Sequence, residues 1–316
     1  MKIVILDWKT MTCENELSPE CFEKFGEVRC YDFTSPELTA ERIGRSEIVL
    51  CNKVRITKDI MDKCPDIKYI GLFATGYNNI DTGYAREKNI TVCNAGEYST
   101  MAVAQHTFAM ILEIYSKIGI YNNAVKDGEW ISSPSFSYFP YTTSELYNKT
   151  LAVIGYGSIG KAVAKIGEAF GMKVIINTRT LPEDCPYEIH TLEECAELAD
   201  IITFHCPLTD KTKGMVNSDL ISRMKKTALI INTSRGAVVN EKDLAEALNN
   251  HRIAGACLDV LEYEPMLREC PLRNAENCII TPHSAWSALE TRQRLLDIVS
   301  RNLENYLNGN PSNKIN

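Results

Sequence analysis

The hydrophobic positions of the first hundred residues come in short runs that alternate with more polar, helix-like stretches. Two of these stretches, residues 36–47 and 57–65, begin with Pro or Thr in the manner of helix starts. Short strands that alternate with helices are typical of a parallel sheet covered on both faces. We therefore expect strands at residues 2–6, 27–33, 47–51, 67–73 and 90–94.

A second alternating series begins near residue 150. Helical patterns such as residues 192–199 and 241–250 lie between its apolar runs. This repetition predicts a second α/β domain built on a parallel sheet. The expected strands are residues 150–155, 173–178, 201–206, 228–233, 253–260 and 278–283.

Three segments depart from this alternation. Residues 99–118 are apolar on nearly every side of a helix, which predicts a helix buried between domains. Residues 128–148 are rich in Ser, Pro and aromatics and form either a surface loop or an arm that packs on a partner subunit. The tail, residues 284–316, is expected to be helical and then polar and frayed.

Residues 155–160, Gly-Tyr-Gly-Ser-Ile-Gly, follow an apolar strand and open a helix, which is the context that the dinucleotide pattern G-x-G-x-x-G requires. Gly155 allows the tight turn, Gly157 lets a pyrophosphate approach the backbone, and Gly160 lets helix and strand pack closely. The phosphates then bind N–H groups at the helix start, beside Ser158 and Ile159. A nucleotide domain is therefore expected in the middle of the chain.

The identity of the dinucleotide depends on the residues that follow the next strand. An NAD-binding unit has an Asp or Glu there for the adenosine ribose, whereas this chain has Thr178, Arg179 and Thr180, all potential donors to a 2′-phosphate. Arg179 stacked on adenine would suit either cofactor. We expect NADP(H), with NAD(H) as the alternative.

Two nearby acids complicate this expectation. Glu183 or Asp184 could fold back to replace the missing acid. Pro182 makes that awkward, because it directs the chain into a loop.

Three later stretches, residues 232–240, 254–265 and 281–286, follow predicted strands and supply one Arg, several carboxylates and one His. The carboxyl ends of parallel strands are where open α/β sheets bind ligands. Hydride transfer to a ketone requires this set of groups. A guanidinium holds a substrate carboxylate in a fork, a His donates a proton near neutrality, and a carboxylate orients that His and favours its protonated form.

Taken together, these residues resemble the D-2-hydroxyacid dehydrogenases over essentially the whole chain, and within them most of all the glycerate dehydrogenases, also called hydroxypyruvate reductases. The resemblance implies two Rossmann-like, doubly wound parallel-sheet domains with a cleft between them. Residues 1–100 and 285–316 would bind substrate, and residues 101–284 would bind the dinucleotide. The resemblance rests on residues 75–81, 103–112, 155–160, 205–209, 232–236, 258–265 and 281–286.

The resemblance also implies roles for single residues. Arg235 would bind the substrate carboxylate and carbonyl, His283 would act as acid and base, and Glu264 would pair with that His. Asp259 matches the family's acid on the cofactor side, although it could instead be structural and hold a loop. Further cofactor contacts would be Cys206, Pro207, Thr233 and Ser234, and further substrate contacts Thr75, Gly76, Tyr77 and Trp286.

The chain departs from the family pattern at two positions. Thr178 stands where NAD-specific members have Asp, which bears on the cofactor. Asn240 replaces an Asp that usually follows the catalytic Arg, and we expect little consequence.

The other histidines have plainer interpretations. His106 lies in an apolar helix and is expected to be a hydrogen-bonded core residue. His190 and His251 lie among polar residues and are expected to be solvated. His205 ends a strand and is expected to line the nucleotide cleft rather than to take part in the chemistry.

The expected function is reduction of hydroxypyruvate or glyoxylate to D-glycerate or glycolate. Two alternatives stay open. One is a dinucleotide-sensing corepressor, and the other is a dehydrogenase for another acid such as 3-phosphoglycerate or D-lactate. A phosphorylated substrate requires additional cations, and residues 75–81 contain none.

Composition narrows the class of protein further. The 316 residues carry a net charge of −7, which is unfavourable for binding nucleic acid or an anionic membrane. We see no apolar stretch near the ~20 residues of a membrane span, and the first residues are typical of a strand rather than a signal peptide. The 12 cysteines show neither C-x-x-C pairs nor zinc-ligand spacing, which favours a reducing cytoplasm and no metal. A homodimer through the central domain and an arm at residues 123–148 is expected.

Overall fold

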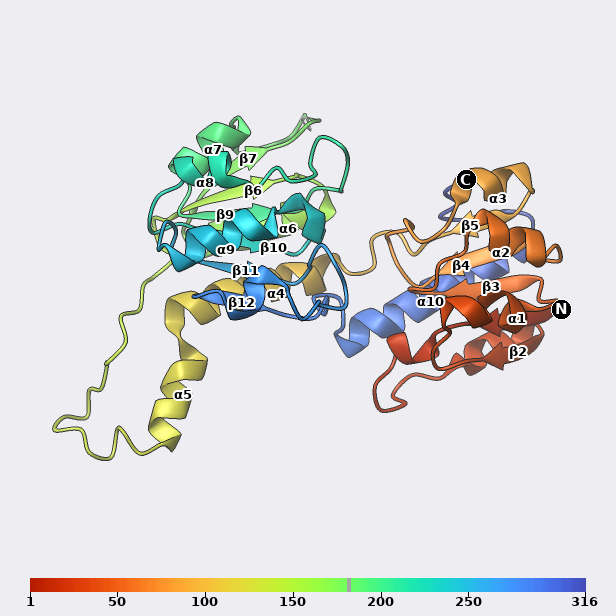
Figure 1. Cartoon of the computed structure of the whole chain (residues 1–316), viewed down its shortest axis with the longest axis horizontal. Helices are drawn as coiled ribbons and strands as arrows, with labels where there is room; N and C mark the ends of the chain where they lie inside the picture. The colour runs from red at the N-terminus through yellow and green to blue at the C-terminus, as the bar shows by residue number, and fades with distance from the viewer. Residues whose placement is uncertain (181–182) are drawn as a thin grey trace. The chain divides into compact units, whose positions relative to one another are not determined.

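A computed structural model describes residues 1–180 and 183–316 and divides the chain into two compact units (Figure 1). Unit 1 contains Met1–Ser99 and Ser287–Asn316, and unit 2 contains Thr100–Trp286. Each unit is built around its own parallel sheet. The predicted fold class, two α/β domains with parallel sheets, is confirmed.

The sheet of unit 1 has five parallel strands in the order β2-β1-β3-β4-β5. β3 and β4 are buried at every position, as is typical of parallel strands covered on both faces. The edge strand β2 is shorter than predicted, because the carbonyls of Tyr31 and Asp32 accept the N–H groups of Trp8 and Lys9 in a loop. The strands are β1 (Lys2–Ile5), β2 (Glu27–Cys30), β3 (Ile48–Cys51), β4 (Tyr69–Leu72) and β5 (Thr91–Cys93).

Helices cover the sheet of unit 1 on both faces. One core cluster combines strand residues such as Val49 and Ile70 with Ile43 of α1, Met61 of α2 and Ala85 of α3. Elsewhere in the unit, α10 and the 3-10 helix η2 pack against each other and on strands of the sheet. The helical segments are η1 (Trp8–Thr10), η2 (Pro19–Phe25), η3 (Pro36–Leu38), α1 (Thr39–Ile43), α2 (Lys58–Lys63), α3 (Thr82–Glu87) and α10 (Leu289–Leu307).

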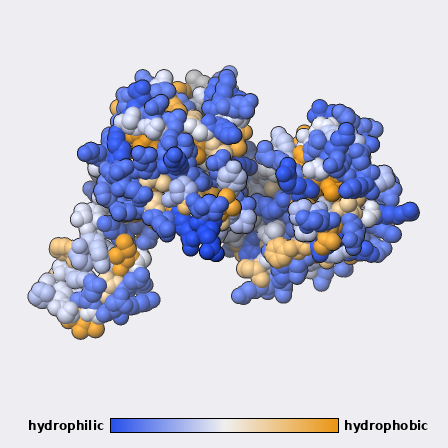
Figure 2. Space-filling model, viewed as in Figure 1, coloured by the Kyte–Doolittle hydropathy of each residue, from blue (hydrophilic) through white to orange (hydrophobic). Residues whose placement is uncertain are grey.

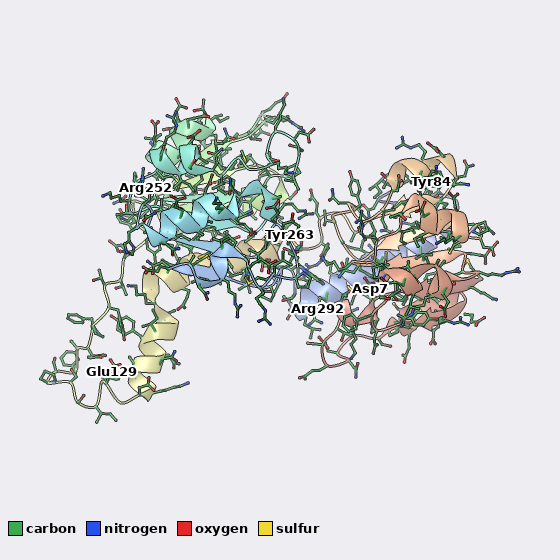
Figure 3. All side chains as sticks on the ribbon, in the orientation of Figure 1. Asp7, Tyr84, Glu129, Arg252, Tyr263 and Arg292 are labelled. Atoms are coloured by element: carbon green, nitrogen blue, oxygen red, sulfur yellow. The ribbon has the colours of Figure 1, made fainter. Side chains whose placement is uncertain are left out.

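The carboxyl ends of β1 and β3 are joined by a buried carboxylate. Asp7, labelled in Figure 3, accepts the backbone N–H groups of Asn52, Lys53 and Val54, with a shortest distance of 2.6 Å. This side chain is only 3% exposed. The loop after β3 is therefore held at the sheet edge by one acid.

The end of the chain is ordered against the sheet, so the expectation of a frayed tail is wrong. Cys93 in the edge strand β5 forms an antiparallel bridge with Lys314. Asn316 accepts the N–H of Val92 at 2.9 Å and donates to the carbonyl of Ile90 at 2.7 Å. Backbone groups of the edge strand that would otherwise face water are thus paired by the last residues.

The sheet of unit 2 has seven parallel strands in the order β12-β11-β10-β9-β6-β7-β8. The chain winds outward from β6 to one edge and then from β9 to the other, so the topological switch point lies between β6 and β9. The short strand β8 was not predicted. The strands are β6 (Thr150–Ile154), β7 (Lys173–Asn177), β8 (Glu188–Ile189), β9 (Ile201–Phe204), β10 (Leu229–Asn232), β11 (Gly255–Leu258) and β12 (Cys278–Ile280).

Helices cover both faces of this sheet as well (Figure 1). One core cluster packs α4 and α6 on residues such as Val153 and Ile231, and a second packs α7, α8 and α9 on residues such as Ile202 and Ile230. The helical segments are α4 (Thr100–Ser116), α5 (Ile118–Lys126), α6 (Ser158–Ala169), α7 (Leu192–Leu198), α8 (Ser218–Arg223), η4 (Gly236–Val238), α9 (Glu241–Asn249) and η5 (Pro271–Asn274).

The helix predicted at residues 99–118 differs from expectation in two ways. It ends at Ser116, because Lys117 adopts a left-handed conformation with φ 52°, and α5 begins after it. It is also not buried all round. Val103, Ala104 and Phe108 are buried, whereas Met101 is 62% exposed.

Residues 127–149 form no helix or strand and extend from α5 as an arm (Figure 1). The arm is held by its own contacts. Tyr121 of α5 donates to the carbonyl of Tyr141 at 2.9 Å, and Trp130 donates to the carbonyl of Phe136 at 3.0 Å. Within the described part of the chain, no helix is long and apolar enough to cross a membrane.

Candidate functional site

The predicted site residues of unit 2 lie along one edge of its sheet, at the carboxyl ends of six strands. Their order follows the order of the strands rather than that of the sequence. The residues are His283 after β12, Asp259 and Glu264 after β11, Thr233, Ser234 and Arg235 after β10, Cys206 and Pro207 after β9, Gly155 to Gly160 after β6, and Thr178 to Thr180 after β7.

The glycine turn fits a dinucleotide phosphate. Gly155 has φ +95°, and a Cβ there would lie 2.7 Å from the carbonyl oxygen of His205. A Cβ on Gly160 would overlap the carbonyl oxygen of Gly155, so helix α6 packs directly on the turn. Around Gly157 there is open space, with no heavy atom within 4 Å of a Cβ position. The N-terminus of α6, with Ser158 and Ile159, is thus accessible to an anion.

The turn after β7 carries hydroxyl and guanidinium groups. Arg179 and Thr180 are exposed, and the half-buried Thr178 donates to the carbonyl of Thr180 at 3.2 Å. Glu183 and Asp184 are exposed on the following turn. Pro182, which was expected to direct the chain into a loop, lies outside the described residues.

An asparagine that sequence reasoning missed shapes the turn that carries Arg235. Asn232, fully buried at the end of β10, accepts the N–H of Ser234 at 3.0 Å and its hydroxyl at 2.8 Å. Its amide donates to the carbonyl of Arg235 at 2.9 Å. The half-buried Arg235 uses one N–H on the carbonyl of Ser234 at 2.7 Å. A guanidinium has five N–H donors, so Arg235 has further donors with which it could bind an anion. A side-chain amide at the last position of a buried strand was the available signal for Asn232.

His283 and Glu264 form a close pair within unit 2. The Nδ1 atom of His283 lies 2.7 Å from Oε2 of Glu264. The other carboxylate oxygen of Glu264 accepts the N–H of Leu261 at 3.0 Å. With Nδ1 engaged by the carboxylate, Nε2 is the ring nitrogen that can exchange a proton with a substrate.

Asp259 holds the turn on which His283 stands. Its carboxylate, 1% exposed, accepts the hydroxyl of Thr281 at 2.6 Å and the backbone N–H groups of Ser284 and Ala285 at 2.8 and 2.9 Å. Its backbone carbonyl accepts the N–H of His283 at 2.7 Å. His283 itself has φ +53°, a conformation that a non-glycine residue adopts only when its surroundings fix it. A contact between Asp259 and the cofactor stays a prediction.

The remaining histidines of unit 2 have distinct environments. His106 lies 3.0 Å from the hydroxyl of Thr281, so it is hydrogen-bonded as expected. Burial lowers the pKa of His205 to about 3. The Nε2 atom of His205 lies 2.9 Å from the hydroxyl of Thr203. His205 is therefore neutral and unsuited to donate a proton at neutral pH.

The expectation that His190 is solvated is wrong. Its side chain is 21% exposed and lies between Glu188 and Glu194, at 3.4 and 3.5 Å. Its backbone carbonyl accepts the amide of Asn177, at the end of β7. His251, by contrast, is 70% exposed.

Of the other predicted substrate residues, three belong to unit 1 and Trp286 belongs to unit 2. Thr75, Gly76 and Tyr77 follow β4 in unit 1, where Thr75 donates to the carbonyl of Gly96 and Tyr77 is 45% exposed. Trp286 is the last residue of unit 2 and is half-buried. Asn240 caps α9 by accepting two backbone N–H groups at 3.2 Å, as an Asp at this position would.

Among residues 1–180 and 183–316, no three His, Cys, Asp or Glu side chains are grouped so as to hold a metal ion. The described groups instead suit proton transfer at His283 and carboxylate binding at Arg235 beside a dinucleotide turn.

Comparison with known proteins gives the class of the protein. Residues 108–285 match the family described as D-isomer specific 2-hydroxyacid dehydrogenase, NAD binding domain. Together with the glycine turn at the switch point of a parallel sheet, this match makes the protein an oxidoreductase that uses a nicotinamide dinucleotide.

Full-length relatives narrow the class to a family. A hydroxypyruvate reductase of Blautia hydrogenotrophica is 41% identical, covering 100% of both chains. A glycerate dehydrogenase of Methylorubrum extorquens is 35% identical over 99% of this chain and 98% of its own. The NADPH-dependent glyoxylate/hydroxypyruvate reductase of Sinorhizobium meliloti, solved with citrate, superposes with a TM-score of 0.85 at 26% identity, covering 99% and 97%. The chain belongs to the D-2-hydroxyacid dehydrogenase family, which confirms the resemblance.

Proposed function

We propose that the protein reduces a small 2-oxo acid, hydroxypyruvate or glyoxylate, to D-glycerate or glycolate. The observation that carries the proposal is the contact of His283 with Glu264 at the same sheet edge as Arg235 and the glycine turn. The full-length similarity to a hydroxypyruvate reductase supports the choice of substrate.

In the proposed reaction, Arg235 binds the carboxylate of the substrate and polarises its carbonyl oxygen. A nicotinamide dinucleotide held by the glycine turn would supply the hydride that the carbonyl carbon of the substrate accepts. His283 donates the proton on Nε2 to the carbonyl oxygen as negative charge develops there. Glu264 accepts the Nδ1 proton of His283 in a hydrogen bond, which orients the ring before the transfer. Solvent then returns a proton to His283.

We further propose that NADP(H) is the preferred cofactor. Thr178, Arg179 and Thr180 supply hydroxyl and guanidinium donors after β7, and the described part of this turn carries no acid until Glu183. A 2′-phosphate would accept hydrogen bonds from these groups. The related Sinorhizobium meliloti enzyme is described as NADPH-dependent.

The arm supports a proposal about assembly. Ile131, Phe136 and Phe139 are 89, 87 and 78% exposed, and Figure 2 shows hydrophobic side chains on this segment. Clustered exposed apolar groups are unfavourable in water and mark contact surfaces. We infer that the arm and unit 2 bind a second copy of the chain in a homodimer. Sedimentation velocity of the native protein and of Phe136→Ser tests this, and a native monomer would contradict it.

The function is tested by initial rates of NADPH and NADH oxidation with a panel of 2-oxo acids. Hydroxypyruvate and glyoxylate are expected to react fastest. Faster turnover of 3-phosphohydroxypyruvate or pyruvate would assign the protein to another acid of the same class. Binding of the dinucleotide without turnover of any 2-oxo acid would favour a dinucleotide-sensing protein instead.

A further inference from the structure

The turn that carries Glu264 packs against the segment that carries Arg235 and is hydrogen-bonded to it. The turn comprises residues 261–264 and is marked by Tyr263 in Figure 3. Its inner contact is the bond from the N–H of Leu261 to Oε1 of Glu264, which fixes the carboxylate within its own turn. A second carboxylate holds the turn from outside, because Oε1 of Glu241 accepts the N–H of Glu262 at 2.7 Å.

Glu241 is itself rigidly placed. It is the first residue of α9, whose N-terminus is capped by Asn240. Its side chain is half-buried, and its second oxygen lies 3.5 Å from the thiol of Cys270. A carboxylate in the first turn of a helix is favoured by the helix dipole. Glu241 can therefore hold the N–H of Glu262 in one position.

A backbone contact lies beside this hydrogen bond. A Cβ on Gly236 would overlap the carbonyl group of Leu261 and the backbone nitrogen of Glu262. Gly236 directly follows Arg235, so the two segments touch without an intervening side chain. Two adjacent contacts therefore fix the turn of Glu264 relative to Arg235. They are the backbone packing at Gly236 and the hydrogen bond accepted by Glu241.

We propose that Glu241 is a positioning residue for the pair formed by Glu264 and His283. It lies outside the set of groups assigned to the substrate and acts through the turn. When the N–H of Glu262 loses its acceptor, the turn can move, and the Glu264 carboxylate no longer stays 2.7 Å from the His283 ring. The inference rests on the proposed acid–base role of His283.

The test uses a double-mutant cycle with Glu264→Gln, measured as kcat and KM for the best 2-oxo acid of the panel. Glu241→Ala should lower kcat roughly tenfold, the loss expected for one charge-assisted hydrogen bond, with KM changed less than about twofold. Glu241→Gln keeps an oxygen acceptor and should stay within about threefold of the native kcat. In the Glu264→Gln background, Glu241→Ala should have little further effect, since both changes act on one pair.

Glu269→Ala is the matched control, because Glu269 lines the same cavity of about 260 Å³ as Glu241 and is exposed. It should retain native kcat. Additive losses in the double mutant, or an equal loss in Glu241→Gln and Glu241→Ala, would overturn the proposal.

A readout without substrate separates this inference from the proposed function. The Nδ1 proton of His283, hydrogen-bonded to Glu264, should give a far-downfield proton NMR signal that disappears in His283→Ala. The signal should persist in Glu241→Gln and Glu269→Ala and be lost or broadened in Glu241→Ala. An unchanged signal in Glu241→Ala refutes the positioning role, whichever acid the enzyme reduces.

Discussion

The Nδ1 atom of His283 lies 2.7 Å from Oε2 of Glu264, and this contact defines which ring nitrogen is available to a substrate. His283→Ala removes the proposed proton donor and should lower kcat by roughly 10²–10⁴-fold, the usual effect of losing a general acid. The dissociation constant of NADPH, measured by fluorescence titration, should barely change, because the glycine turn is untouched. Native-like turnover in this variant would refute the assignment.

Arg235→Lys retains the positive charge but removes the fork of the guanidinium. One charge-assisted hydrogen bond is worth about 1.5–3 kcal/mol, so kcat/KM for hydroxypyruvate should fall roughly ten- to a hundredfold. Steady-state kinetics measure the change. Lysine working as well as arginine would exclude a bidentate contact.

Trp286 stands three residues after His283 at the end of unit 2. We expect its indole to limit the size of the substrate side chain, so hydroxypyruvate and glyoxylate should react faster than branched or aromatic 2-oxo acids. Trp286→Ala should reduce that preference, as measured by kcat/KM for hydroxypyruvate and phenylpyruvate. A native preference for phenylpyruvate would contradict the expectation.

Cofactor preference should depend on the turn after β7. Native enzyme should favour NADPH over NADH by about ten- to a hundredfold in kcat/KM, given the worth of a charged hydrogen bond. Thr178→Asp combined with Arg179→Ala should reverse the preference, because the new carboxylate accepts from a ribose hydroxyl and repels a phosphate. Initial rates measured with NADPH and with NADH give the preference of the native enzyme and of the double variant. A tenfold native preference for NADH would show that this turn does not bind a 2′-phosphate.

Burial of His205 should make stability depend on pH. Its pKa is lowered to about 3 in the folded protein, whereas an unfolded histidine titrates near 6.5. Below about pH 6.5 the unfolded chain binds a proton that the folded one does not, so stability is lost as the pH falls from about 6.5 toward 3. When the pH is lowered from 7 to 5.5, the free energy of unfolding measured by urea denaturation should fall by about 1 kcal/mol more for the native protein than for His205→Gln. Equal losses would show that His205 takes up its proton in the folded state.

The strands and the dinucleotide turn were predictable because their signals are local. Buried parallel strands are continuous apolar runs, as in Ile48–Cys51 and Leu229–Asn232. The spacing of Gly155, Gly157 and Gly160 reports a backbone geometry that few other residues allow.

The missed features depend on partners that are distant in the sequence or on single backbone angles. His190 is enclosed by Glu194 and by Glu188 of β8, a two-residue strand too short for a periodic signal. The break at Lys117 is one left-handed residue in an apolar run. The tail is held by a hydrogen bond from the backbone of β5 to the side chain of Asn316, and no local sequence pattern predicts this contact.

The alternatives left open for Asp259 also required coordinates. The sequence could not decide between an acid beside the cofactor and an acid that holds a loop. The bonds of Asp259 to Thr281, Ser284 and Ala285 show that it organises the turn of His283. Whether it also faces the nicotinamide is a separate prediction about the complex.

The discontinuous make-up of unit 1 has a consequence for biosynthesis. Its core includes Leu295, Leu296, Val299 and Leu303 of α10, all at most 3% exposed, and this helix is translated after the whole of unit 2. Unit 2 is continuous, and domains generally fold as units during synthesis. Unit 2 should therefore reach its native state on the ribosome while the five strands of unit 1 still expose apolar surface. The nascent protein should need protection from aggregation at the strands of unit 1, which are translated before unit 2 and wait for α10 to complete their core.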